Sequence, residues 1–299
     1  MAIQIPNEIV LENYKLKENK DSRLIDRKII LAISAAWQAG VEVLKIYDTA
    51  FTVHYKTDTS PVTLADQKAE NIIRNELEKE GLPIISEETK QAPYNRRKKW
   101  QRFWMVDPLD GTKEFVDKNG EFTINIAYIE NGVPCYGVLY APFYEQMLIA
   151  DVPNRKVFRL AIDKFNSLPS FHQLEQYLEK VPKPRNTECR TLAISRSHLD
   201  KTTQKIMESL VSTSQFKVVR IGSALKYIKL VIDEIQLYFR FSPTMEWDNA
   251  AGHALCLARG MEMCQIPDKK PIEYNSPSLI SPSFVAGTST AIQQFFDCI

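Results

Sequence analysis

The spacing of apolar residues divides the chain into alternating helices and strands. Helical periodicity predicts amphipathic helices over 22–50, 65–79, 200–211, 223–231 and 248–259. Short apolar or β-branched runs predict strands over 82–86, 103–107, 122–130, 134–142, 191–195, 216–221 and 235–241. Gly81 is expected to end the second helix, and Pro108 to break the strand before it. Asn131-Gly132 predicts a hairpin turn, and the alternation of elements predicts a layered α/β fold.

Two segments lack this regularity. Residues 51–63 mix β-branched and polar side chains up to Pro61, which predicts extended chain or a hairpin. Residues 151–190 contain four prolines and little periodicity. We therefore expect a variable excursion between two halves of the fold, with one helix at 171–180.

Composition narrows the class of protein. The 299 residues can bury a large core, and 44% hydrophobic with 25% charged residues is ordinary for a globular protein. A formal net charge of +1 argues against nucleic-acid binding but leaves a small anionic substrate open. The five cysteines form no CxxC pair, so neither a disulfide framework nor a zinc site is expected. The N-terminal segment is charged, and no apolar run is long enough to span a membrane. We therefore expect a cytoplasmic protein without stable membrane insertion. Peripheral association at the inner face of the membrane is left open.

The segment DPLDGT follows one of the apolar strands. Asp107 ends the strand and Asp110 comes three residues later, so both carboxylates can converge at one strand end. Gly111 and Thr112 follow, and their N–H groups can point at an anion if a helix begins there. Carboxylates on a tight turn suit a hard cation such as Mg²⁺, which shares phosphate oxygens. An Asp-Pro or Asp-Gly pair alone is more simply a surface turn, but six such residues behind a buried strand favour a metal site.

Two further segments supply acidic residues. WDNAAG (247–252) places Asp248 at the start of an alanine-rich helix, and SEE (86–88) places Glu87 at the end of a strand. Taken alone, Asp248 is more simply a helix cap and the glutamates are solvated loop residues. The joint occurrence of these segments with DPLDGT, in this order, argues for one shared site.

Together, several segments resemble the inositol monophosphatase-like family of lithium-sensitive sugar and nucleotide phosphatases. They are DTSPVTLAD (58–66), PIISEE (83–88), WMVDPLDGTKEF (104–115), NGEFTINIA (119–127), ISRSH (194–198), IGSALK (221–226) and PTMEWDNAAGHA (243–254). DPLDGTKEF and ISRSH are most similar to the 3′(2′),5′-bisphosphate nucleotidase (CysQ-type) branch. The resemblance implies an α-β-α-β-α sandwich and one phosphatase unit over 1–299. An N-terminal half, 22–150, would carry most metal ligands, and a C-terminal half, 190–299, would carry Asp248 and the substrate-recognition residues.

The resemblance also implies roles for individual residues. Two or three Mg²⁺ ions would be held by Glu87, Asp107, Asp110, Asp248 and the backbone carbonyl of Leu109. The catalytic set would be Asp66, Thr112 and Glu87, with Thr112, held by Asp66, orienting the attacking water. Asp66 is otherwise explained as a helix cap. The substrate would be contacted by Glu87, Leu109, Asp110, Gly111, Thr112 and Asp248 around its phosphate, and by Ser195, Arg196, Ser223, Lys226 and Arg240 around the nucleotide.

The expected function is therefore a lithium-sensitive, magnesium-dependent phosphomonoesterase of sulfur metabolism. Its expected substrate is adenosine 3′,5′-bisphosphate, and the protein is expected to be a monomer or homodimer. An inositol or sugar monophosphatase is the first alternative, and a non-catalytic interaction protein is the second, which the filled ligand positions disfavour.

Other features are interpreted as structural. His253 is interpreted as a packed histidine, and residues 96–102 as a solvated basic loop. Ser195 and His198 lack the nucleophile elbow of a serine hydrolase. The apolar stripe over 24–44 is interpreted as core or subunit interface.

Overall fold

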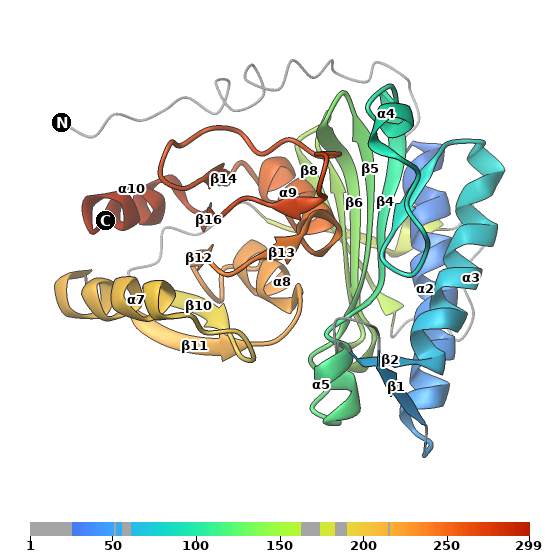
Figure 1. Ribbon diagram of the computed structural model, residues 1–299, viewed down its shortest axis with the longest axis horizontal. Helices are drawn as coiled ribbons and strands as arrows, with labels where there is room; N and C mark the ends of the chain where they lie inside the picture. Colours follow the sequence, from blue (N-terminus) through green and yellow to red (C-terminus); the bar gives the residue numbers. More distant parts are fainter. Residues whose placement is uncertain (1–25, 51, 56–60, 163–173, 183–189, 215) are drawn as a thin grey trace.

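The structure, a computed structural model, describes residues 26–50, 52–55, 61–162, 174–182, 190–214 and 216–299. The helices are α2 (Arg27–Tyr47), α3 (Leu64–Leu77), α4 (Tyr94–Arg97), α5 (Thr112–Val116), α7 (Lys201–Ser214), α8 (Leu225–Val231), α9 (Glu246–Arg259) and α10 (Ser289–Asp297). Helices α2 and α3 cover one face of a seven-stranded sheet, and α8 and α9 separate that sheet from a five-stranded one (Figure 1). Helices α7 and α10 cover the far face of the second sheet. The predicted α-β-α-β-α sandwich is confirmed.

The seven-stranded sheet carries one side of the site. In spatial order its strands are β3 (Ile84–Ser86), β4 (Arg102–Asp110), β5 (Thr123–Glu130), β6 (Val133–Ala141), β7 (Gln146–Asp151), β8 (Lys156–Leu160) and β9 (Leu178–Lys180). β3 and β4 are parallel, and the remaining pairs are antiparallel. The hairpin predicted at Asn131-Gly132 is confirmed as the β5–β6 connection.

The prediction for residues 151–190 was wrong in the described part of that segment. Instead of an excursion, β8 and β9 extend the sheet beyond β7. The expected helix at 171–180 is replaced over 175–180 by a 3₁₀ turn (Glu175–Tyr177) and β9. Residues 171–173 lie outside the described residues. Short edge strands form here because the neighbouring strand satisfies their backbone groups, which sequence periodicity does not reveal.

The prediction that Pro108 breaks its strand was also wrong. β4 continues to Asp110, and its register against β5 shifts between Asp107 and Asp110. Such an irregularity accommodates proline, which has no N–H to donate to the ladder. Both carboxylates therefore remain on one strand, at the end that faces the second half of the molecule.

The five-stranded sheet carries the other side of the site. In spatial order its strands are β11 (Lys217–Ile221), β10 (Thr191–Ser195), β12 (Leu237–Arg240), β16 (Phe284–Gly287) and β14 (Glu262–Gln265). Two small antiparallel pairs complete the strands: β1 (Val53–Tyr55) with β2 (Pro61–Thr63), and β13 (Thr244–Met245) with β15 (Ile280–Ser281). The hairpin predicted over 51–63 is confirmed. Strands β7, β14, β15 and β16 and helix α10 were not predicted from the sequence.

Alternation along the strands builds two apolar layers around the large sheet. On β5, Ile124 and Ile126 pack towards α2 and α3, whereas Ala127 and Ile129 pack towards α9. Of the described helices, only α2 has the length and hydropathy of a membrane span. Of the 18-residue stretch of α2 that meets this description, 61% is buried inside the protein. Its apolar stripe lies in the core, as the sequence indicated.

The basic run at 96–102 is mostly exposed, as expected, with Arg97 as the exception. Arg97 is only 3% exposed, and its guanidinium donates to Asn275 Oδ1 and to the carbonyls of Ser276 and Pro277. Arg97 therefore links α4 to residues 275–277.

Candidate active site

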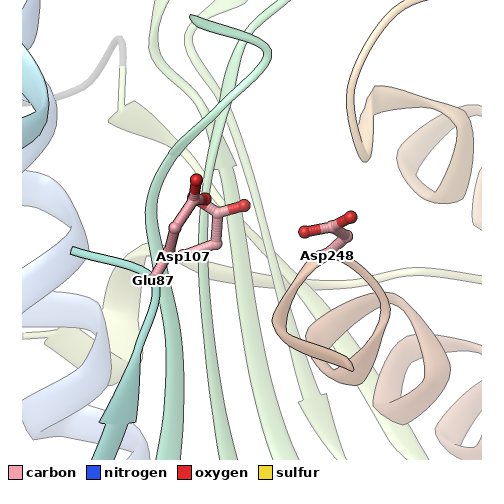
Figure 2. Close-up of side chains that lie close together, drawn as sticks. All are labelled: Glu87, Asp107 and Asp248. Atoms are coloured by element: carbon pink, nitrogen blue, oxygen red, sulfur yellow. The ribbon is translucent and has the colours of Figure 1, made fainter. Parts of the chain in front are cut away.

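Three of the predicted metal ligands come together at the junction between the two halves. Glu87 follows β3 and Asp107 lies near the end of β4, so the parallel pairing of these strands brings them to the same sheet edge. Asp248 faces them from the start of α9 (Figure 2). One carboxylate oxygen from each residue lies within 4.8 Å of the others.

Asp248 is both a helix cap and a member of this cluster. Helix α9 begins at Glu246, two residues before the predicted start, which puts Asp248 at its third position. Asp248 Oδ2 accepts a hydrogen bond of 3.0 Å from the N–H of Met245. The capping interpretation and the metal interpretation are thus compatible, because one carboxylate has several acceptor positions.

Asp110 lies beside the cluster with a different partner. Its Oδ2 accepts the N–H of Ala224 at 2.5 Å and the Asn125 amide at 3.5 Å. Leu109 N donates to Asp107 Oδ1 at 3.1 Å, which helps to fix the irregular stretch of β4 between the two aspartates. Asp110 therefore joins the end of β4 to the 221–224 turn of the other half.

Burial and mutual repulsion make this site electrostatically costly without a cation. Burial, then the charges of Glu87, Asp110 and Asp248, raise the pKa of Asp107 well above its usual range. Burial and the neighbouring carboxylates likewise raise the pKa of Asp248. For Asp110, burial raises the pKa to about 6 against the opposing charge of Lys226. Clustered carboxylate oxygens that repel one another are suited to a hard divalent cation such as Mg²⁺. The donor set therefore fits the predicted metal.

The predicted pair of Asp66 and Thr112 is also in contact. Asp66 is 1% exposed, and its Oδ2 accepts from both the N–H and the hydroxyl of Thr63 at 2.6 and 2.7 Å. Its Oδ1 accepts the hydroxyl of Thr112 at 3.0 Å. Asp66 thus caps α3 and holds Thr112 at the same time. Gly111, with φ of 89°, is the N-cap of α5, so a helix does begin directly after DPLDG.

A cavity of about 610 Å³ opens beside the carboxylates. It is lined by the predicted residues Glu87, Asp107, Leu109, Asp110, Gly111, Thr112, Ser195, Ser223, Lys226, Arg240 and Asp248. Lys226 is 2% exposed, and burial lowers its pKa to about 8. Its ammonium donates to the carbonyls of Ile221 and Ser223. Lys226 and Arg240 bring positive charge to a cavity that the acidic residues also line.

Some residues differ from the sequence-based assignment. Arg196 does not line the cavity, because its guanidinium pairs with Glu121 at 2.6 Å. Glu114 and His198 do line it, although neither was assigned a role, and Glu114 accepts the Ser197 hydroxyl at 2.5 Å. Both belong to DPLDGTKEF and ISRSH, so their presence in those segments was the available signal. His253 is a packed histidine, as predicted: it is fully buried and lies 3.0 Å from the Tyr274 hydroxyl.

Comparison with known proteins agrees with this geometry. A sequence model of the inositol monophosphatase family matches residues 26–295. The 3′(2′),5′-bisphosphate nucleotidase CysQ of Salmonella typhimurium is 37% identical over 253 residues, which are 83% of this chain and 95% of that protein. CysQ from Bacteroides thetaiotaomicron has a similar structure, with a TM-score of 0.79 and 34% identity over 89% of this chain and 98% of that one. An IMPase from Thermotoga maritima has a TM-score of 0.72 and 22% identity over 91% and 96% of the two chains. The chain belongs to the inositol monophosphatase family.

Proposed function

We propose that the protein is a magnesium-dependent phosphomonoesterase that hydrolyses adenosine 3′,5′-bisphosphate to AMP and phosphate. The observation that carries this proposal is the cluster of Glu87, Asp107 and Asp248 in a cavity that also contains Lys226 and Arg240. The relatives named as 3′(2′),5′-bisphosphate nucleotidases, with 36 to 38% identity, support the substrate.

The carboxylates would bind the metal. Glu87, Asp107 and Asp248 would hold one Mg²⁺ ion between them, and Asp110 with the Leu109 carbonyl would contribute to a second. When bound, Mg²⁺ supplies positive charge for the phosphate and makes a nearby water more acidic. The raised pKa values of Asp107, Asp110 and Asp248 support this role. Repulsion between the carboxylates is one cause of these raised values, and a bound cation would relieve it.

Thr112 would position the attacking water. Its hydroxyl proton is donated to Asp66 at 3.0 Å rather than to the Leu109 carbonyl at 3.2 Å, because a hydrogen bond to a carboxylate is the stronger one. The lone pairs of the Thr112 oxygen can then accept a proton from a water in the cavity. That proton can pass through the hydroxyl to Asp66, which acts as the base.

The start of α5 would hold the scissile phosphate. The first N–H groups of a helix have no intrahelical acceptor, and those of Gly111 and Thr112 lie at the edge of the cavity. Ser195, Ser223, Lys226 and Arg240 would contact the remainder of the nucleotide, with the two cations binding its second phosphate.

The substrate assignment is tested by a phosphate-release assay with Mg²⁺ on several phosphate esters. The proposal expects kcat/KM for adenosine 3′,5′-bisphosphate to exceed that for inositol 1-phosphate, since substrate discrimination is measured by this ratio. A ratio in favour of inositol 1-phosphate would replace the proposal with the inositol phosphatase alternative.

Two further properties belong to the proposal. Inhibition by Li⁺ rests on family membership, and activity that is unchanged at high Li⁺ in a titration against Mg²⁺ would contradict it. A cytoplasmic location fits the described cysteines, all of which are free thiols, and cell fractionation would test it.

A further inference from the structure

The turn formed by residues 221–224 is held at both ends by carboxylates of the other half of the molecule. It connects β11 to α8 and carries Ser223 on the cavity wall. The N–H of Ala224 donates to Asp110 at 2.5 Å. The N–H of Gly222 donates to Glu121 Oε2 at 2.7 Å. Asp110 is a proposed metal ligand, whereas Glu121 has no role in the chemistry described above.

Glu121 is bound in turn by Arg196. The guanidinium makes two hydrogen bonds of 2.6 Å, from Nε to Oε2 and from Nη2 to Oε1. Arg196 Nη2 also donates to the carbonyl of Arg220, the residue before the last of β11, at 2.8 Å. A two-pronged contact of this kind fixes orientation as well as distance. Arg196 therefore joins the ends of β10 and β11 to the segment that carries Glu121.

Close packing leaves Glu121 little freedom to move. A Cβ added at Gly111 would lie 2.8 Å from the Glu121 carbonyl oxygen and 3.0 Å from Ser223 Cβ. A Cβ added at Gly222 would lie 2.9 Å from Glu121 Oε2. Glu121 is thus wedged between the turn that starts α5 and the turn before α8. A displacement of Glu121 would move both turns, because neither has space to absorb it.

The ion pair is charged across the neutral pH range. Burial raises the pKa of Glu121, but the hydrogen bonds from Arg196 and from the Gly222 N–H outweigh it and lower the pKa below its usual value. The pair is also partly sheltered, since the Glu121 side chain is only 13% exposed and that of Arg196 is 44% exposed.

We propose that Glu121 and Arg196 are positioning residues. They hold the 221–224 turn so that the Ala224 N–H keeps its hydrogen bond to Asp110 and Ser223 stays on the wall of the cavity that binds the nucleotide. This assigns Arg196 a structural link in place of the substrate contact expected from the sequence. The proposal rests on the proposed function, because it concerns metal and nucleotide binding at that same site.

The test compares Glu121→Ala, Glu121→Gln and Arg196→Ala with the double variant and a matched control. The control is Glu76→Ala, because the Lys79–Glu76 pair has the same 2.6 Å distance and similar exposures of 55% and 15%, but lies at the end of α3. Two properties are measured: KM for adenosine 3′,5′-bisphosphate, and the Mg²⁺ concentration that gives half of the maximal rise in melting temperature.

Glu121→Ala is expected to raise both values by about tenfold, the effect of losing one charge-assisted hydrogen bond at each site. Arg196→Ala is expected to shift them less, because the Gly222 N–H keeps its acceptor. Adding Arg196→Ala to Glu121→Ala should change nothing further. Glu121→Gln should keep both values close to those of the wild type, since its amide oxygen can still accept the Gly222 N–H. The control should leave both values unchanged.

Three results would overturn the proposal. One is a Glu121→Ala variant with the wild-type KM and Mg²⁺ response. Another is a fall in melting temperature alone, which would indicate a purely structural pair. The third is an Arg196→Ala effect on KM that is larger than, and additive with, that of Glu121→Ala, which would mean that Arg196 contacts the nucleotide. If Glu121→Ala does not fold, Arg196→Ala decides: a smaller rise of both values supports the proposal, and wild-type values for both overturn it. The Mg²⁺ melting measurement needs no turnover, so wild-type protein that is inactive on the nucleotide would contradict the proposed function but not this pair.

Discussion

Replacing Asp248 by asparagine should stabilise the metal-free protein and abolish its response to Mg²⁺. Asp248 shares a cluster with Glu87 and Asp107 in which carboxylate oxygens lie within 4.8 Å of one another. The substitution removes one negative charge from this cluster and keeps the size of the side chain. The helix cap survives, because the asparagine oxygen can still accept the Met245 N–H that Asp248 binds at 3.0 Å.

Coulomb's law sets the size of the effect. Two like charges at 4.8 Å repel by about 3 kcal/mol with an effective dielectric constant of about 20. For a chain of this length, about 2 °C of melting temperature corresponds to 1 kcal/mol, so the variant should melt roughly 6 °C higher in EDTA. The size of the gain depends on pH. Because burial and like charges raise the pKa of Asp248, the folded state binds a proton more tightly than the unfolded state, and stability falls as pH rises through the raised value. The gain should therefore grow as pH rises, because more of the wild-type carboxylate is then ionised.

The assay is thermal unfolding at pH 8 in EDTA and in excess Mg²⁺. Wild-type protein should melt higher with Mg²⁺, and Asp248→Asn should melt at the same temperature in both. Asp151→Asn is the control, because Asp151 is a buried carboxylate that binds Asn154 outside the cluster. It should keep the Mg²⁺ response. An Asp248→Asn variant that melts lower than wild type in EDTA, or that still responds fully to Mg²⁺, would refute the reasoning.

Three other predictions follow from the same contacts. Thr112→Ala should lower kcat about 10²- to 10⁴-fold with little change in KM. Thr112→Ser should keep most of the wild-type rate, because its hydroxyl can still reach Asp66. Steady-state kinetics would measure both effects. Arg240→Gln should raise KM for adenosine 3′,5′-bisphosphate about tenfold or more, while kcat/KM for p-nitrophenyl phosphate stays unchanged. Equal losses of kcat/KM on both substrates would contradict the assignment of Arg240 to the second phosphate. Burial lowers the pKa of His253 to about 3, so the folded state resists protonation, and stability should fall by roughly 1.4 kcal/mol per pH unit as pH drops from about 6.5 towards 3. His253→Asn should flatten this slope in urea unfolding between pH 7 and pH 4, and a slope identical to wild type would exclude His253 as its cause.

The sequence predicts most of the fold where a segment carries its own periodic signal. Helix α2, with 21 residues and an apolar stripe, and the β5–β6 hairpin with its Asn131-Gly132 turn are of this kind. β8 and β9 are not, because they are stabilised by pairing with one another and with β7 rather than by their own pattern. The irregularity at Pro108 also depends on the partner strand, since the register shift exists only relative to β5.

The site shows the same division. Asp66 had two competing interpretations, as a cap and as the partner of Thr112, and the structure shows that its two oxygens do both. Arg196 could not be placed from sequence, because its partner Glu121 lies 75 residues earlier and only the fold brings them together. Local motifs therefore identify which residues gather at a site, whereas long-range pairing decides which of them reach the cavity.

The central claim is that the carboxylate cluster is the metal site of a nucleotide phosphatase. The most direct measurement is the rate of phosphate release from adenosine 3′,5′-bisphosphate as Mg²⁺ is titrated into metal-free wild-type protein. We expect no release in EDTA and a rate that rises with Mg²⁺ to a plateau, with no such rise for Asp107→Asn. Release that is independent of Mg²⁺, or equal release by Asp107→Asn, would contradict it.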